Sequence, residues 1–325
     1  MAKVAIVEKQ PSKIKYEQYF DFDFDKYQLC SDPTIKRILK RDTDIEIDTD
    51  DYDWLVLVGS EPVKHFTTVS SVTDYSGKKV DSKFLPVISP AMLAFKPEAK
   101  KAWDESVASI HGYISGDIEE AIIDEKVAFG IQDTQEANEF IKQAIKHPSP
   151  YIALDSETTG LYPRDGYMLG ISISYNGKCG AYIDTDCFDD TTEQLLQQLF
   201  TEKTVVFHNA KFDMAFFEYH FHFKFPNFED TMLLHYLVDE NPGGHGLKQL
   251  AIKHTPYGDY EKPMYEWIDQ YRKEHGILKD QFTWDSIPFD VMKTYAAMDA
   301  LVTFILYEKL LVVKTNEKLK KVYEE

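Results

Sequence analysis

Hydrophobic and polar positions alternate in short blocks along the first half of the chain. Three apolar runs have the length of buried strands and are bounded by polar or turn residues, namely residues 4–7, 54–58 and 84–88. Three further segments space their apolar residues as a helix does, namely residues 33–40, 97–110 and 134–146. The alternation of the two kinds of segment predicts a small α/β domain.

The pattern is interrupted at Pro148 and Pro150, and we place a domain boundary between residues 147 and 148. Three strand-like runs joined by short glycine-containing turns come next, at residues 151–155, 168–175 and 179–183. Such turns favour an antiparallel meander. Helices and strands then alternate until a long final helix begins at Phe289. Residues 148–325 are therefore predicted to form a second, larger α/β domain.

Composition supports a folded protein and changes the expected chemistry. The 325 residues suffice for two domains, and 43% hydrophobic content supplies their cores. Acidic residues outnumber basic ones by 55 to 36, which gives a net charge of −19. Phosphates would be repelled by this charge unless metal ions or a local basic groove intervened, so duplex binding by counterion release alone is disfavoured.

Cysteine usage and the absence of long apolar runs indicate the compartment. The three cysteines form no C-x-x-C pair, which argues against a disulfide framework and a thiolate zinc site. The histidines between residues 208 and 254 also lack the spacing of a zinc site. The apolar run at the start is too short for a signal peptide, and no run reaches 18 residues. We expect a soluble, cytoplasmic protein without a membrane partner.

Acidic residues recur at the ends of predicted elements in the second domain. Asp155 and Glu157 end an apolar strand and lie two residues apart, so both face the same side. Asp213 opens a helix just after another apolar strand, where sites of α/β proteins gather. Tyr295 and Asp299 are four residues apart on the final helix and share one of its faces. An acid among apolar residues needs a partner or a cation, so we expect a metal site.

These residues carry a resemblance. In their order along the chain, D-x-E, N-x-x-F-D and Y-x-x-x-D resemble the three exonuclease motifs of the DEDD superfamily, Tyr subtype. The resemblance covers about residues 148–312 and is greatest to the 3′→5′ proofreading domain of family A DNA polymerases from bacteria and tailed phages. Residues 208–213 and 229–233 are also similar to stretches of that domain. It implies a ribonuclease-H-like mixed sheet flanked by helices and metal-dependent hydrolysis of single-stranded DNA 3′ ends.

The resemblance also implies roles for the acids. Hard Mg²⁺ or Mn²⁺ ions prefer oxygen ligands, and a pair of them can bind the attacking and the leaving oxygen of a phosphodiester. We expect Asp155, Glu157, Asp213 and Asp299 to bind two such ions, directly or through water, with Asp155 bridging both. Tyr295 is expected to orient the attacking water, because an ordinary pKa near 10 makes it a poor general base at neutral pH.

Substrate contacts follow from the same resemblance. Thr158 would meet the region of the terminal 3′-hydroxyl, Leu161 would wedge against the terminal base, and Asn209 and Phe212 would line the strand path. Leu161 and Phe212 could equally be core residues. For Asp230, which precedes an apolar helix, an N-cap role is favoured over a metal-ligand role.

The first 147 residues offer a fainter resemblance. Residues 55–62 and 85–93 are similar to sheet-and-loop elements of uracil-DNA glycosylases, but Ser89-Pro90 stands where that family has His-Pro, and no water-activating acid can be placed. We expect a non-catalytic α/β domain that positions DNA or docks a replication partner.

Two other functions stay open beside the DNA exonuclease, and so does the relation of this chain to a polymerase. The polymerizing domains of a family A polymerase have no counterpart in the sequence, so we expect no polymerase activity and either a piece of a longer chain or a subunit that pairs with a separate polymerase. An exoribonuclease of the ribonuclease D type would share the same motifs. The other alternative is a non-catalytic docking module that has kept the motifs without the activity. The aromatic and basic segment 256–284 could stack single-stranded bases or simply pack as a connector.

Overall fold

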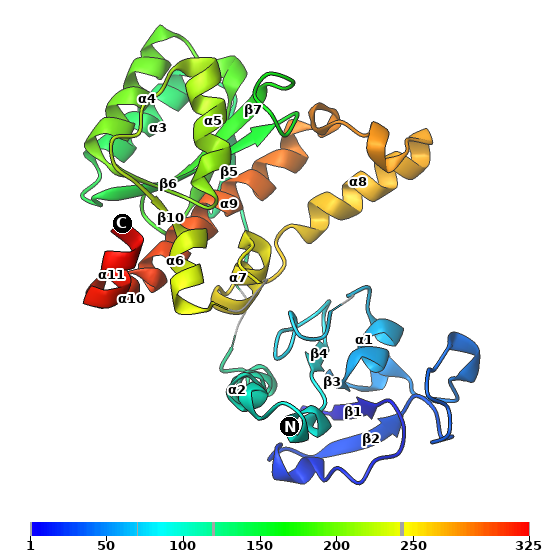
Figure 1. The fold of residues 1–325 in the computed structure, drawn as a ribbon. Coiled ribbons are helices and arrows are strands. Elements are labelled where there is room, and N and C mark those ends of the chain that lie inside the picture. Colours follow the sequence, from blue (N-terminus) through cyan, green and yellow to red (C-terminus); the bar gives the residue numbers. More distant parts are fainter. Residues whose placement is uncertain (1, 70, 119–120, 241–243, 325) are drawn as a thin grey trace. The chain divides into compact units, whose positions relative to one another are not determined.

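The computed structural model describes residues 2–69, 71–118, 121–240 and 244–324. The chain divides into two compact units, residues 1–120 and residues 121–325, each with its own sheet and helices (Figure 1). None of the helices within the described residues has the length and apolar composition needed to cross a membrane.

The first unit contains a four-stranded parallel sheet in the order β2-β1-β3-β4. Its strands are β1 (Val4–Glu8), β2 (Phe24–Gln28), β3 (Trp54–Val58) and β4 (Phe84–Val87). Alternate residues of the strands face two different cores, because successive side chains of a strand point to opposite sides. Trp103 of helix α2 (Lys100–Ser115) packs in one core, and Val63 of helix α1 (Ser60–Phe66) packs in the other.

The prediction of a helix at residues 33–40 is wrong, because the structure has a turn at residues 33–34 and bends at residues 36–37. Asp32 accepts hydrogen bonds from both the backbone amide and the hydroxyl of Thr34, which fixes a local turn. Side chains of Lys9 and Gln10 donate to backbone carbonyls of this segment, which a helix would have used internally. Tertiary contacts have therefore replaced the helical hydrogen bonds.

The second unit is built on a six-stranded mixed sheet in the order β10-β9-β6-β7-β8-β5. The strands are β5 (Ala128–Ile131), β6 (Tyr151–Thr158), β7 (Met168–Ser174), β8 (Gly180–Asp184), β9 (Thr204–Phe207) and β10 (Phe228–Asp230). Strands β6, β7 and β8 are antiparallel neighbours, which confirms the predicted meander. Strand β9 runs parallel to β6, β10 runs parallel to β9, and β5 runs parallel to β8.

Helices cover both faces of this sheet (Figure 1). Helices α3 (Thr134–Lys146), α4 (Asp190–Glu202) and α5 (Ala210–Phe221) pack on one face, and α9 (Phe289–Leu310) crosses the other. The remaining helices are α6 (Thr231–Val238), α7 (Leu247–His254), α8 (Lys262–His275), α10 (Val312–Thr315) and α11 (Glu317–Glu324). Helix α8 lies in the aromatic and basic segment 256–284, for which both base stacking and packing as a connector were considered. The mixed sheet between helical layers confirms the predicted α/β, ribonuclease-H-like fold.

The division between the units differs from the boundary placed between residues 147 and 148. Strand β5 pairs with β8, and helix α3 shares a hydrophobic core with α4, so both elements belong to the second unit. Pro148 and Pro150 lie in the turn between α3 and β6, inside one domain. Prolines interrupt helices at internal turns as readily as at domain boundaries, and the sequence pattern could not separate the two cases.

Helix α9 lies unusually close to the sheet. A Cβ atom at Gly180, the first residue of β8, would come within 1.9 Å of the backbone oxygen of Ala297 on α9. Only glycine permits this approach. The close contact holds α9 against the strands at the level of its catalytic-motif residues, because Ala297 lies between Tyr295 and Asp299.

Candidate active site

Strand β6 presents two acids to helix α9. Ile152 and Leu154 face the core beneath α3, α4 and α5, so Asp155 and Glu157 alternate with them and face the opposite side of the sheet. Glu157 is buried and Asp155 is half-buried. The pairing of β6 with β7 shifts register between Glu157 and Thr158, and β6 ends at Thr158. The two acids therefore lie at the end of a fixed central strand.

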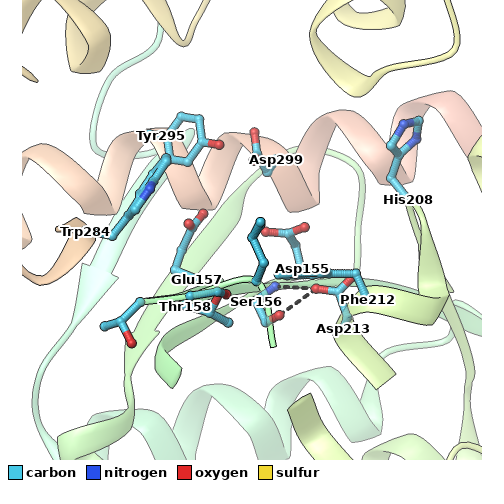
Figure 2. Close-up of a pocket in the computed structure, with 13 residues that line it drawn as sticks. Asp155, Ser156, Glu157, Thr158, His208, Phe212, Asp213, Trp284, Tyr295 and Asp299 are labelled. Atoms are coloured by element: carbon cyan, nitrogen blue, oxygen red, sulfur yellow. Dashed lines mark hydrogen bonds between the residues drawn. The ribbon is translucent and has the colours of Figure 1, made fainter. Parts of the chain in front are cut away.

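Helix α9 supplies the opposing residues. Tyr295 and Asp299 are one turn apart, and Asp299 is buried. Carboxylate oxygens of Asp155, Glu157 and Asp299 lie within 4.8 Å of one another. Figure 2 shows Tyr295 and Asp299 on the helix directly above the two acids of the strand. The structure thus brings together three acids that are up to 144 positions apart in sequence.

Asp213 joins the site from the side of helix α5 (Figure 2). Its Oδ1 atom accepts hydrogen bonds from the backbone amide of Ser156 at 3.0 Å and from the Ser156 hydroxyl at 2.6 Å. Asp213 lines the same pocket as the other three acids, but it falls outside the group whose oxygens lie within 4.8 Å. One of its oxygens is consequently engaged by the protein.

The four acids destabilise one another in the ionised state. Burial raises the pKa of Asp155, Glu157 and Asp299 well above the usual range, and repulsion from neighbouring carboxylates raises it further. Burial also raises the pKa of Asp213 to about 7, although the hydrogen bonds from Ser156 oppose this rise. Buried anionic oxygens that repel each other are a poor structural arrangement without a cation. The all-oxygen donor set fits Mg²⁺ or Mn²⁺.

Two tyrosines lie close to Asp299, and one of them donates a hydrogen bond to it. Tyr260, in the loop before α8, donates from its hydroxyl to Oδ1 at 2.5 Å. Tyr295 lies one turn before Asp299 on the same helix and lines the pocket with it. Burial raises the pKa of both tyrosines well above 10, so both phenols keep their protons near neutral pH. Tyr295 is therefore a donor and not a proton acceptor.

A pocket of about 350 Å³ opens above the acids. Thr158, Leu161 and Phe212 line it, as the sequence-based assignment requires. Leu161 is 77% exposed, which excludes a core role for it. Phe212 lines the pocket and also packs against Phe216, with ring centroids 5.2 Å apart. Thr158 uses its hydroxyl to donate to the backbone oxygen of Gly160.

Asn209 is the one predicted substrate residue that does not line the pocket. It is exposed and adopts a left-handed backbone with φ 71° just before helix α5. Asp230 accepts hydrogen bonds from the amides of Asn209 and Ala210, and it also caps helix α6 by accepting from the amides of Met232 and Leu233. The predicted N-cap role of Asp230 is confirmed. It holds together the turn that leads to Asp213.

The sequence reasoning did not name several residues near the acids as site residues. Ser156, His208 and Trp284 line the pocket, and Tyr260 contacts Asp299 behind it. Ser156 lies inside the D-x-E motif and His208 directly precedes Asn209, so their proximity could have been found from the motif positions. Trp284 and Tyr260 come from the long segment before α9, where no local pattern indicates which aromatic side chain reaches the site.

Comparison with known proteins agrees with this geometry. The model of the 3′-5′ exonuclease family matches residues 129–313, more than half of the chain. A DNA polymerase of Escherichia phage T5 is 40% identical over 99% of this chain and 40% of its own length. A DNA polymerase of Bacillus phage SP01 is 24% identical over 86% of this chain and 33% of its own length. The chain spans less than half the length of these relatives.

Two solved structures with a similar fold have low sequence identity to this chain. The catalytic core of RRP6 from Trypanosoma brucei is 18% identical, with a TM-score of 0.45 over 63% of this chain and 52% of that chain. RNase D of Escherichia coli is 18% identical, with a TM-score of 0.43 over 56% of this chain and 44% of that chain. From the family match, this chain belongs to the 3′-5′ exonuclease family of the DNA polymerase A type.

Proposed function

We propose that this protein removes nucleotides from the 3′ end of single-stranded DNA and releases nucleoside 5′-monophosphates, with two Mg²⁺ or Mn²⁺ ions as cofactors. The observation that carries the proposal is the group of carboxylate oxygens from Asp155, Glu157 and Asp299, which lie within 4.8 Å of one another beneath an open pocket. Family membership supports the direction of hydrolysis.

The acids hold the cations. Asp155, Glu157 and Asp299 offer the converging oxygens, with Asp155 and Glu157 on the strand and Asp299 on the helix above them. Asp213 would act directly or through water, and Ser156 donates two hydrogen bonds to one of its oxygens. When bound, the two ions supply charge neutralisation for the acids and stabilise charge on the attacking and leaving oxygens. Their binding also relieves the repulsion that raises the four pKa values.

Tyr295 positions the attacking water. Its phenol keeps its proton because burial raises its pKa, so it donates a hydrogen bond and does not remove a proton. The Tyr295 hydroxyl and the Asp299 carboxylate face the pocket together (Figure 2). The tyrosine can therefore orient a water molecule at the pocket's acidic wall.

The apolar side of the pocket suits a nucleobase. Leu161 stays 77% exposed, although leaving a large aliphatic side chain in water is unfavourable, and it lines the pocket with Phe212 and Trp284. Base stacking on apolar and aromatic side chains tolerates different sequences. An exposed leucine beside aromatic side chains favours binding of a frayed, single-stranded terminus over binding of a base pair. Contacts to the sugar then decide between DNA and RNA.

The test is digestion of a 5′-labelled single-stranded DNA oligonucleotide with Mg²⁺ or Mn²⁺, beside an RNA oligonucleotide of equal length. We expect a 3′→5′ ladder on DNA that the double variant Asp155→Ala, Glu157→Ala loses. Asp104→Ala, Glu105→Ala is the matched control, because it removes two exposed acids from α2 in the other unit. A faster ladder on RNA would favour the exoribonuclease alternative. The absence of a ladder from a folded, metal-replete chain would contradict the proposal.

We propose further that the exonuclease serves a DNA polymerase as a proofreader. The phage T5 and SP01 relatives are DNA polymerases, which supports a primer terminus as the substrate and a polymerizing protein or domain as the partner. The bacterial cytoplasm is then the place of action. Faster removal of a mispaired than of a paired 3′ nucleotide is the expected result, and equal rates would argue against proofreading.

The first unit is proposed to be a non-catalytic domain that positions DNA or docks the replication partner. Its buried acid, Glu8 at the end of β1, accepts hydrogen bonds from Ser12 and Tyr16 and pairs with Lys26 at 2.9 Å. An acid engaged in this way supports the structure of the loop and is not free to activate water. An assay for uracil excision should show no product, and excision would overturn this assignment.

A further inference from the structure

Tyr260 makes the tightest contact to the acidic cluster from outside the exonuclease motifs. Its hydroxyl donates to Asp299 Oδ1 at 2.5 Å, and the residue is only 5% exposed. Its ring belongs to the hydrophobic core formed by α7, α8 and α9, which also contains Leu250 and Ala296. Tyr260 does not line the pocket. It therefore contacts Asp299 from the hydrophobic core.

Lys248 forms ion pairs with the loop that carries Tyr260. Lys248 of helix α7 places its Nζ atom 3.1 Å from Asp259 Oδ1 and 3.7 Å from Glu261 Oε2. These two acids flank Tyr260 in sequence, so the lysine holds the backbone on both sides of the tyrosine. The same Nζ atom lies 5.6 Å from the centre of the Tyr265 ring, at the start of α8. The position of the Tyr260 hydroxyl is thus determined by ion pairs as well as by packing.

A fixed donor matters because Asp299 faces other acids. Asp299 Oδ1 is engaged by Tyr260, and one Asp299 oxygen belongs to the group that lies within 4.8 Å of Asp155 and Glu157 oxygens. Without a donor behind it, a carboxylate can rotate about its side-chain bonds away from like charges. Tyr295 lies one turn from Asp299 on α9, but the proposed reaction assigns its hydroxyl to the attacking water. Tyr260 is the donor that remains.

We propose that Tyr260 is a positioning residue, which holds Asp299 in the orientation that binds a divalent cation, and that Lys248 fixes Tyr260 through Asp259 and Glu261. This inference rests on the proposed function, since it assigns a cation to the acidic cluster. Hydrogen-bond partners of metal ligands commonly contribute 10- to 100-fold to metal affinity or activity. A tyrosine that only filled the core would contribute through its ring and not through its hydroxyl.

Tyr260→Phe separates these two roles, because it keeps the ring and removes the hydroxyl. We expect Mn²⁺ affinity of the full chain without DNA, measured by calorimetry or by electron paramagnetic resonance, to fall about 10- to 100-fold. Exonuclease activity should fall at low Mg²⁺ and recover at high Mg²⁺, with little change in the KM for DNA. Tyr257→Phe is the matched control, since Tyr257 lies in the same loop and packs partly buried on the same core.

Lys248→Met provides a second test that keeps the apolar stem of the side chain. It should weaken Mn²⁺ binding less than Tyr260→Phe does, because packing still holds the ring. Wild-type Mn²⁺ affinity in Tyr260→Phe would overturn the inference whatever the activity is. Should Tyr260→Phe fail to fold, unchanged Mn²⁺ affinity in Lys248→Met would overturn it. If the wild-type chain binds Mn²⁺ but digests no DNA, the proposed function fails, and the Mn²⁺ titrations of the two variants still decide the inference.

Discussion

Replacing Asp213 with asparagine should make the metal-free protein more stable at neutral and alkaline pH while it lowers exonuclease activity. Burial raises the pKa of this carboxyl to about 7. The folded state therefore binds a proton more tightly than the unfolded state does. The stability that the proton contributes is fully present below pH 4 and is lost as the pH rises through 7. Asparagine is neutral at every pH and avoids that loss.

The magnitude follows from the same shift. A rise from 3.8 to about 7 corresponds to about 4 kcal/mol once the group is ionised in the folded state, at about 1.4 kcal/mol per pH unit. Asparagine can still accept both hydrogen bonds from Ser156 through its single carbonyl oxygen, because both reach the same oxygen of Asp213. These bonds lose their charge assistance, so we expect a net gain of about 2–4 kcal/mol at pH 8.

Thermal unfolding with EDTA between pH 4.5 and 8.5 measures this effect. For a unit of about 200 residues, a gain of this size corresponds to a rise in Tm of about 5–15 °C at pH 8. The gain should shrink towards zero near pH 4.5, where the wild-type carboxyl is protonated in the folded state. Saturating Mg²⁺ should reduce the advantage of Asp213→Asn, because the cation stabilises the wild-type acids.

Two results would refute the reasoning. The first is a lower Tm for Asp213→Asn than for the wild type at pH 8 in EDTA, which would show that the carboxylate is net stabilising without metal. The second is a Tm difference that does not change with pH, which would show that proton binding at Asp213 is not its cause. Asp190→Asn, an exposed acid on α4, serves as the control and should change Tm by less than 1 °C at either pH, since surface substitutions change stability little.

Four further predictions concern single side chains. Tyr295→Phe should lower kcat by about 100-fold with little change in the KM for DNA, and an unchanged kcat in single-turnover assays would remove the water-orienting role. Leu161→Ala should raise the KM for single-stranded DNA several-fold and leave Tm unchanged, because the side chain is 77% exposed. Gly180→Ala should unfold or strongly destabilise the second unit, since its Cβ would lie 1.9 Å from a backbone oxygen of α9; wild-type Tm would contradict that packing. Asp230→Ala should cost about 1–3 kcal/mol in urea unfolding, because two helix starts lose their acceptor, whereas a loss below 0.5 kcal/mol would contradict this.

The face on which a residue lies within a single strand or helix could be predicted from the sequence without knowledge of the fold. The spacing of Asp155 and Glu157 on a strand puts both on one face whatever the rest of the chain does, and the spacing of Tyr295 and Asp299 on a helix does the same. The meander of β6, β7 and β8 was equally predictable, because short turns force neighbouring strands to pair. These features depend on backbone geometry over a few residues.

Errors arose where one signal has two physical origins. Pro148 and Pro150 end a helix but do not end the domain, since β5 finds its partner in β8, about 50 residues further along the chain. The apolar spacing at residues 33–40 is helical, yet side chains of Lys9 and Gln10 bind the carbonyls that a helix would need. In both cases a distant segment competes with a local preference.

Tertiary structure alone decided how the acids are supported. Tyr260 and Trp284 lie in a long aromatic segment whose residues look alike in sequence, but only the path of the chain around α8 brings them to Asp299 and to the pocket. The sequence by itself determined which residue types carry the chemistry and on which face of each element they lie, because these depend on local geometry. The fold decided which distant side chains orient those residues, because such contacts depend on how loops close and cores pack.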